Sequence, residues 1–227
     1  MHAPHAADRL AGETRAERER LAAILGGLTP EDWSAPSLCA GWRVQDAVAH
    51  ITMPFRTRPA GHLAGLARAG FSFHRYADRD ARSTAHRCSQ AELVDLLRRN
   101  IDNPWQPPGD GGAGAGALSH DVIHGLDVTE PLGLTAAPAE RIALVLGSMR
   151  PRHLRYFGVD LEGQRLTATD ADVSVGAGPR VVPMTAKEIL LTVTGRRTLA
   201  RQSSEGEEAT SEPVRRPAGK RGRVRDQ

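Results

Sequence analysis

The strongest constraint on the fold comes from two histidines set in an apolar segment. His120 and His124 lie four residues apart, and four apolar residues are interspersed with them: Val122, Ile123, Leu126 and Val128. If this segment is helical, both imidazoles leave the same face, with about 5–6 Å between their Cβ atoms. The apolar residues predict a largely buried helix, and buried imidazoles need partners for their ring nitrogens. A divalent ion shared by both rings is one solution, and a chance pair on an ordinary helix is the alternative.

A third ligand is needed for a tight site, and we expect it to be His50. A helix that begins at residue 44 has an apolar face, formed by Val44, Ala47, Val48 and Ile51. His50 lies at the edge of that face, so its ring can point into the interior beside a neighbouring helix. Three imidazoles leave a tetrahedral ion one open position, which is typical of catalytic sites. The expected metal is zinc, and nickel or iron are the alternatives that imidazole also suits.

Four further residues are candidates for the surroundings of such a metal. Asp121 and Asp127 lie on the same segment as the histidine pair, so either carboxylate can orient a ligand imidazole from behind. A solvated helix face or a helix cap is the alternative for both. Arg43 and His74 are candidate contacts for an anionic substrate. The sequence assigns a catalytic role to none of these residues.

The remaining chemically distinctive residues have a structural interpretation. Cys39 and Cys88 are the only cysteines, and they form neither a metal motif nor a disulfide framework. No basic residue is fixed beside Cys39 in the sequence, which favours a small buried residue over a nucleophile. Trp33 and Trp42 are expected to pack in the core at one end of the helices.

Helical periodicity, capping residues and prolines divide the chain into a helical part and a β-containing part. We expect helices over residues 7–28, from 44 to about 54, over 90–101 and 117–132, and from 138 onward. Residues 70–83 show no clear pattern, and 103–116 form a loop rich in proline and glycine, either a linker or one wall of a cleft. Alternation with period two then predicts strands over 165–169, 172–175 and 180–182, before a short helix over 185–191.

These elements predict a mainly α chain in three parts: a helical bundle over 7–157, a small α+β lobe over 158–201 and a disordered charged tail over 202–227. The formal net charge is a modest +3, and the tail carries an acidic patch followed by a basic one. The folded part therefore gives no case for binding nucleic acid, and only a weak contact by the basic tail remains open. With neither an apolar signal segment nor an apolar run of about 18 residues, we expect a cytoplasmic protein with reduced thiols and no membrane contact. The sequence is silent on oligomeric state.

Three groups of motifs resemble a known family. The first comprises residues 28–33 (LTPEDW) and 36–50 (PSLCAGWRVQDAVAH), and the second comprises 122–127 (VIHGLD) with 132–133 (LG). The third comprises 166–170 (LTATD), 176–179 (GAGP) and 191–197 (LTVTGRR). Over about residues 8–200, the chain is similar to the mycothiol-dependent maleylpyruvate isomerase family, within the DinB-like metal-binding four-helix bundles.

The resemblance implies an up-down-down-up four-helix bundle with a divalent metal between its helices and mycothiol as co-substrate. The family's first histidine ligand falls on His50 and its last on His124. The position four residues before the last histidine is Glu in the isomerase pattern and is His120 here. A set of three histidines is closer to the DinB-type bundles, so this departure argues against maleylpyruvate isomerisation as the reaction.

Three functions are compatible with such a chain. The first is an enzyme in which a metal-bound thiol, ionised at neutral pH, attacks a small electrophile and gives S-transfer or isomerisation. The second is a metal-dependent hydrolase of the same bundle, with water in place of the thiol. The third is a non-catalytic, metal-stabilised interaction or regulatory module with the tail as its contact arm. Thiol-dependent turnover would separate the first function from the other two.

Overall fold

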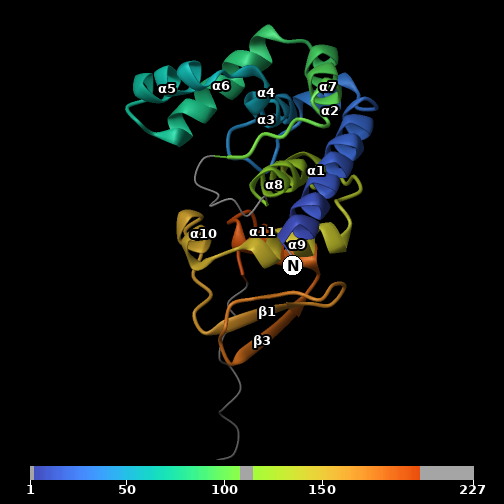
Figure 1. Ribbon diagram of the computed structural model, residues 1–227, viewed down its shortest axis with the longest axis vertical. Helices are drawn as coiled ribbons and strands as arrows, with labels where there is room; N and C mark the ends of the chain where they lie inside the picture. Colours follow the sequence, from blue (N-terminus) through green and yellow to red (C-terminus); the bar gives the residue numbers. More distant parts are fainter. Residues whose placement is uncertain (1–2, 108–114, 200–227) are drawn as a thin grey trace, which may run out of the picture.

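The computed structural model describes residues 3–107 and 115–199, and these residues are mainly helical (Figure 1). The N-terminal part contains α1 (Ala3–Leu25), α2 (Pro30–Ser34), α3 (Val44–Ile51), α4 (Met53–Arg56), α5 (Pro59–Arg68), α6 (Phe73–Arg87) and α7 (Gln90–Arg99). After the gap follow α8 (Gly116–Thr129), α9 (Ala139–Ser148), α10 (Pro151–Tyr156), β1 (Gln164–Ala168), β2 (Ser174–Val175), β3 (Arg180–Met184) and α11 (Ala186–Val193). The predicted mainly α fold with a small β-containing C-terminal lobe is confirmed, whereas the tail over 202–227 lies outside the described residues.

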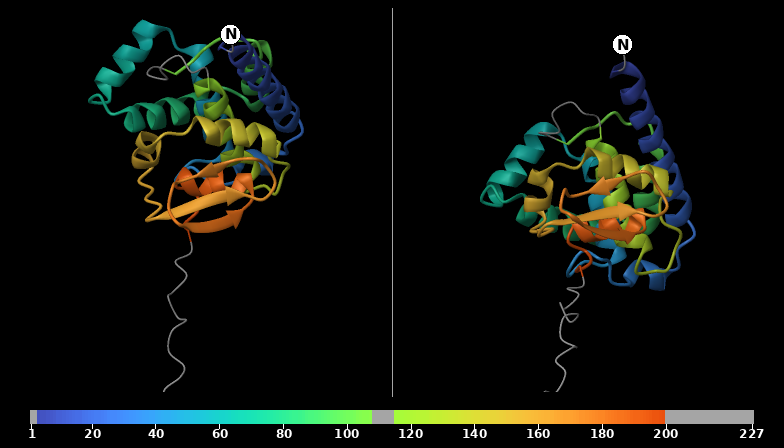
Figure 2. Two further views of the ribbon diagram at one scale, coloured as in Figure 1. Left: turned by 60° about the horizontal axis from the view of Figure 1, so that its bottom comes forward. Right: turned by 90° about the horizontal axis from the view of Figure 1, so that it is seen from below.

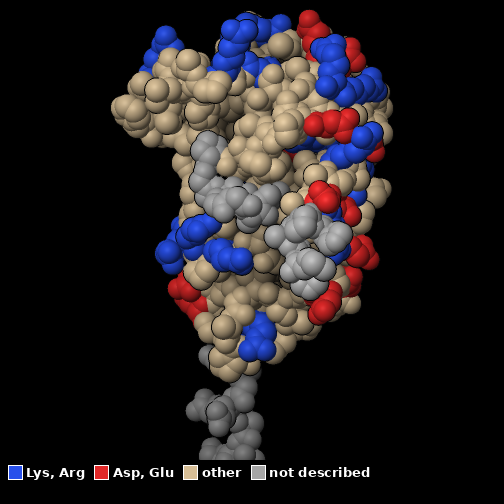
Figure 3. Space-filling view, viewed as in Figure 1, with Lys and Arg blue, Asp and Glu red and all other residues tan. Residues whose placement is uncertain are grey.

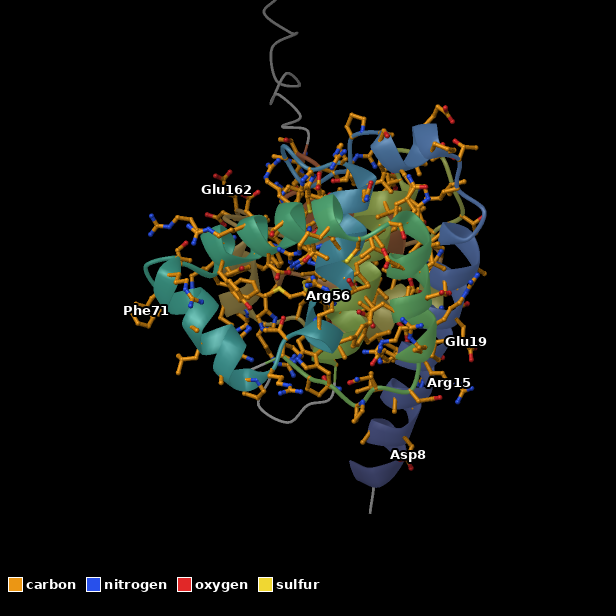
Figure 4. All side chains as sticks on the ribbon, turned by 90° about the horizontal axis from the view of Figure 1, so that it is seen from above. Asp8, Arg15, Glu19, Arg56, Phe71 and Glu162 are labelled. Atoms are coloured by element: carbon orange, nitrogen blue, oxygen red, sulfur yellow. The ribbon has the colours of Figure 1, made fainter. Side chains whose placement is uncertain are left out.

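The helices of the N-terminal part and α8 pack around a shared apolar core. α1 packs against α7 and α8, and α3 packs against α6 and α8. Fully buried side chains from several helices fill this core, among them Leu21, Leu25, Val48 and Leu97. On its outer side, α1 carries the exposed ion pair Arg15–Glu19, whose nitrogen and oxygen lie 3.0 Å apart (Figure 4). α1 is thus amphipathic, and its inner face positions residues against α8.

α8 is buried on nearly all sides because it contributes to two cores. Val128 belongs to the core of the bundle, whereas Leu118 and Val122 pack in a second cluster with residues of α9 and α11. Gly125 lets α1 approach closely, since a Cβ there would lie 3.0 Å from Cδ2 of Leu21. The buried polar side chains of α8, Asp121 and Asp127, therefore need partners within the protein.

Residues 70–83, for which the sequence showed no clear pattern, lie mostly in α6. The buried face of α6 is formed largely by small side chains: Tyr76, Ala77, Ala81, Thr84 and Ala85. α5 and α6 form a helical hairpin that projects from the bundle (Figures 1 and 2). Gly70 and Phe71 in the turn between them have φ angles of 64° and 58°, and the Phe71 side chain projects into solvent (Figure 4).

The C-terminal lobe is a three-stranded sheet with a helix packed on it. β1 is the central strand, antiparallel to β2 and parallel to β3, and Leu166 is paired with both Val175 and Val182. α11 packs against β1 and α9, and the sheet lies at the opposite end of the molecule from α5 (Figure 1). The second hydrophobic cluster joins α8 and α9 to this lobe, across the predicted boundary at residues 157 and 158. That boundary stays a prediction.

The surface offers no strong preference for one charge sign on the face shown in Figure 3, where acidic and basic side chains are interspersed along the side formed by α1 and α7. Within the described ranges, no helix combines the length and the apolar character that a membrane span requires.

Candidate metal centre

Three histidines converge where α3 packs against α8. His50 comes from the last turn of α3, and His120 and His124 come from successive turns of α8. The ring centroid of His50 lies 4.6 Å from that of His124 and 5.4 Å from that of His120, and the two α8 rings are 5.0 Å apart. One nitrogen of each ring lies within 4.8 Å of the others, so a single ion can contact all three. The structure therefore brings together the three residues that the sequence singles out.

Local sequence explains how α3 directs His50 inward. The helix begins after Arg43, whose backbone N–H donates to Asp46 Oδ2 at 2.9 Å and so starts the first turn. Nearly every residue from Val44 to Ile51 is buried, and His50 is only 5% exposed. The side chains of His120 and His124 keep 14% and 17% exposure. The site is thus closed on the α3 side and retains contact with solvent at the two α8 rings.

Each α8 histidine is held by a carboxylate through its Nδ1 atom. Nδ1 of His120 lies 2.9 Å from Asp121 Oδ1, and Nδ1 of His124 lies 2.8 Å from Asp127 Oδ2. A carboxylate accepts hydrogen bonds, so in the neutral form of each ring this contact favours the tautomer with the proton on Nδ1 and the lone pair on Nε2. Metal-binding histidines in proteins are commonly oriented in this way by a carboxylate behind the ring. Asp121 and Asp127 thus contact the two rings that they are expected to orient, and the orienting role itself stays a prediction.

Both carboxylates are in turn held by arginines, of which Arg18 is buried and Arg196 is partly buried. Arg18 Nε donates to Asp121 Oδ2 at 2.7 Å, and both side chains of this pair are 1% exposed. Arg196, which follows α11, donates to both oxygens of Asp127 at 2.7 and 2.8 Å. Burial opposes ionisation of Asp127, but the hydrogen bonds from Arg196 and His124 outweigh it and lower the pKa of this carboxyl. The result is two Arg–Asp–His chains, one reaching α8 from α1 and the other from the C-terminal lobe.

Burial favours the neutral form of His50 and of His124, which is the form that can bind a metal. Burial lowers the pKa of His50 well below its ordinary value, and the neighbouring His124 and His120 lower it further. Burial also lowers the pKa of His124, although Asp127 opposes this shift. Nδ1 of His50 is buried without a hydrogen-bond partner among the described residues. A neutral, partly unpartnered imidazole set fits a divalent ion.

A second group with metal-ligand spacing consists of Cys39, His124 and Asp127. Its polar contacts argue against a metal there, because Arg196 already places its positive charge on both oxygens of Asp127. The Cys39 thiol donates to Asp127 Oδ2 at 3.1 Å, and burial together with the Asp127 charge raises the pKa of this thiol. Because metal binding needs a thiolate, the three-histidine group is the better site. Cys39 agrees with the sequence interpretation in being partly buried, but its thiol also contacts Asp127 beside the candidate metal centre.

The indole rings of two tryptophans lie beside His50 and His120. Trp33 lies in the core, as expected from the sequence, with 2% exposure. The expectation of core packing is only partly right for Trp42, which is half-buried, donates its Nε1–H to Asp78 at 2.7 Å and lies 5.3 Å from the ring centroid of His50. Trp105, which the sequence did not single out, lies edge-on to His120 with the same 5.3 Å separation. Both indoles therefore belong to the surroundings of the site.

The two candidate anion contacts have other partners. Arg43 pairs with Asp46 at 3.2 Å, and His74 is stacked on Tyr156 with 5.5 Å between ring centroids. Neither of these contacts involves the three histidines, so an anion-binding role for Arg43 and His74 stays a prediction. Arg18 and Arg196 were not found from the sequence, since nothing near either residue marks it as the partner of a distant carboxylate.

Comparison with known proteins agrees with the family indicated by the sequence motifs. Residues 14–104 match the family model of the mycothiol maleylpyruvate isomerase N-terminal domain, a range that includes His50 and ends before α8. Two solved structures are similar in fold: the mycothiol-dependent maleylpyruvate isomerase and a variant of it with one histidine replaced by alanine. Each is 14% identical, with a TM-score of 0.56 over 84% of this chain and 90% of the other. No curated protein matches by sequence. The resemblance to this family is confirmed.

Proposed function

We propose that this chain, a relative of the mycothiol-dependent maleylpyruvate isomerases, is an enzyme that binds a divalent metal and uses mycothiol to act on a small electrophile. His50, His120 and His124 would hold the metal. The observation that carries the proposal is the common orientation of the two α8 rings: a carboxylate holds each Nδ1 and leaves each Nε2 for an ion. The reaction class is S-transfer or isomerisation.

The ligand set suits the ionisation of a thiol. A divalent ion bound at the three histidines would supply the positive charge that favours a thiolate at neutral pH, where a free thiol is mostly protonated. Neutral imidazoles add no negative charge that would weaken this effect. Burial lowers the pKa of His50 and of His124, which keeps both rings neutral at the pH where a thiol must ionise. Zinc is the proposed metal, and nickel or iron are the alternatives.

The chain's own residues define the other properties of the site. Asp121 and Asp127 hold the α8 rings in place, which limits the rearrangement needed when an ion binds. Trp42 and Trp105 cover parts of His50 and His120 with apolar rings and so reduce the access of bulk water. Partial exposure of His120 and His124 leaves an approach for a small molecule.

Support for mycothiol and for the substrate differs in strength. The family match over residues 14–104 and the likeness in fold to the isomerase favour mycothiol as the thiol. Maleylpyruvate is not proposed as the substrate, because His120 replaces a negatively charged ligand of the isomerase pattern with a neutral one. A neutral ligand in that position would leave a bound divalent ion with more of its positive charge. A cytoplasmic location, where such thiols are kept reduced, belongs to the same proposal.

Calorimetry with mycothiol tests this function directly. The proteins are the zinc-loaded wild type, a His124→Ala variant and, as a matched control, His86→Ala, which removes an exposed histidine of α6. We expect one metal per chain and mycothiol binding for the wild type and the control, and loss of both for His124→Ala. A thiol-consumption screen with small electrophiles then identifies the reaction.

Two results would overturn the proposal. Stoichiometric metal in a protein that lacks all three histidines would show that the ion binds elsewhere. Equal mycothiol affinity in the wild type and His124→Ala, or no binding to the metal-loaded wild type, would point to a hydrolase or an interaction module instead.

A further inference from the structure

Arg18 is the most completely buried charged side chain of α1 that contacts the site. It is 1% exposed, and its Nε donates to Asp121 Oδ2 at 2.7 Å. Its Nη2 has no hydrogen-bond partner among the described residues, and its guanidinium lies 5.0 Å from the ring centroid of Phe55. Burying two charges is costly, and apolar replacements of such pairs are often no less stable. Stability alone therefore does not explain why an arginine occupies this position.

Arg18 also contacts the chain segment that follows α7. Its Nη1 donates to three backbone carbonyls, those of Asn100, Ile101 and Asn103, at 3.1, 3.2 and 2.7 Å. Two residues further along the chain is Trp105, whose ring lies edge-on to His120 at 5.3 Å. The guanidinium thus anchors the segment that supplies the aromatic neighbour of one candidate metal ligand.

The contact between Arg18 and Asp121 also leads to His120. Asp121 presents Oδ2 to Arg18 and Oδ1 to Nδ1 of His120, the latter at 2.9 Å. We propose that Arg18 is a positioning residue for His120, which fixes the tautomer and orientation of this ring through Asp121 and through the segment that carries Trp105. The inference rests on the proposed metal site and adds to it a residue from the N-terminal helix.

The geometry requires an arginine at this position. The planar guanidinium directs Nε toward a carboxylate while Nη1 points to carbonyls in another direction. A lysine keeps the positive charge but offers a single nitrogen, which cannot hold both partners in place. Arg18→Lys is therefore expected to keep the charge and lose the orientation.

Metal affinity and spectroscopy test the proposal without reference to enzymatic turnover. Cobalt(II) is titrated into metal-free protein, with a competing chelator to measure affinity and the visible absorption spectrum to report ligand geometry. Arg18→Lys should lower cobalt affinity by about 10–100-fold, the range found when a partner of a metal ligand is lost. The spectrum should change, and ¹⁵N NMR of the His120 ring should show loss of the single Nδ1–H tautomer.

A double-mutant cycle separates positioning from a general effect on the fold. If Arg18 acts through Asp121, Arg18→Lys should cost much less cobalt affinity in an Asp121→Asn background than in the wild type. Arg141→Lys is the matched control, because Arg141 also forms partly buried ion pairs with α1, to Glu13 at 2.8 Å and Glu17 at 2.9 Å. It should leave cobalt affinity and spectrum unchanged.

The experiments distinguish a failure of the Arg18 role from a failure of the proposed metal site. Absence of cobalt binding by the wild type would overturn the metal site itself. If the wild type binds cobalt and Arg18→Lys binds it equally well with the same spectrum, the positioning role is wrong. An equal loss in both backgrounds would show that Asp121 does not transmit the effect of Arg18 to His120, which overturns the proposed Arg18–Asp121–His120 chain. An Arg18→Lys protein that does not fold would assign Arg18 to stability.

Discussion

Nδ1 of His124 lies 2.8 Å from Oδ2 of Asp127, and this contact leaves Nε2 as the free nitrogen of the ring. Asp127 is 0% exposed and is held from the other side by Arg196, which donates to both of its oxygens. Asp127 therefore contacts one candidate metal ligand, and a residue of the C-terminal lobe holds Asp127 in place. Three predictions concern this contact and the residues beside it, and a fourth concerns the α5–α6 hairpin.

Replacing Asp127 should weaken metal binding more than it weakens the fold around the site. In Asp127→Asn the side chain keeps its shape but can present an amide N–H to Nδ1 of His124, so the ring is no longer held in one tautomer. We expect zinc affinity to fall by about 10–100-fold. Competition with a fluorescent chelator measures it, and an unchanged affinity would remove Asp127 from the site.

The same carboxylate predicts how stability depends on pH. The hydrogen bonds of Asp127 lower its pKa in the folded protein below the ordinary value of 3.8, so its contribution to stability is fully present above that value. The contribution is lost as the pH falls toward the folded-state pKa. Urea unfolding should show wild type more stable than Asp127→Asn at pH 6, with a difference that narrows below about pH 4. A difference that stays constant would contradict this account.

Cys39 should react slowly with alkylating reagents. Burial and the charge of Asp127 raise the pKa of its thiol, so little thiolate is present at pH 8. In a Cys88→Ser protein, where Cys39 is the remaining thiol, iodoacetamide labelling followed by mass spectrometry should be far slower than the labelling of a small free thiol. Labelling at the rate of the free thiol would mark Cys39 as a candidate nucleophile.

Two glycines of α5 provide a matched test of how the helical hairpin packs. A Cβ at Gly65 would overlap the ring of Tyr76 in α6, whereas a Cβ at Gly61 would only touch Thr57 Cγ2 at 3.8 Å. Gly61→Ala should stabilise the protein by up to about 1 kcal/mol through helix propensity. Gly65→Ala should destabilise it by about 1–3 kcal/mol through overpacking. Thermal unfolding measures the stability of the two variants. Equal effects would show that α5 and α6 can move apart to accommodate a methyl group at Gly65.

Much of the candidate site could be predicted because its signals are local. The spacing of His120 and His124 requires only that the segment be helical, and His50 could be identified from the apolar face of its own helix. Asp121 and Asp127 lie within three residues of the histidines that they contact. Residues on one helical segment carry their geometry in their spacing.

The parts that could not be predicted depend on long-range contacts. Arg18 is 103 residues from Asp121, and Arg196 is 69 residues from Asp127, so no pattern near either arginine indicates its partner. α6 showed no clear pattern because alanines form much of its buried face, and these contribute little to hydrophobic periodicity. Trp42 was expected in the core because an indole usually packs there, but its half-buried ring also reaches His50.

The contact between Arg196 and Asp127 also affects when the site can form while the chain is being synthesised. Contacts between residues far apart in sequence form late, because a long chain segment must first be closed. Since Arg196 follows α11, a nascent chain that already contains all three histidines still lacks the group that holds Asp127. Tight metal capture is therefore expected only after the chain through Arg196 has left the ribosome.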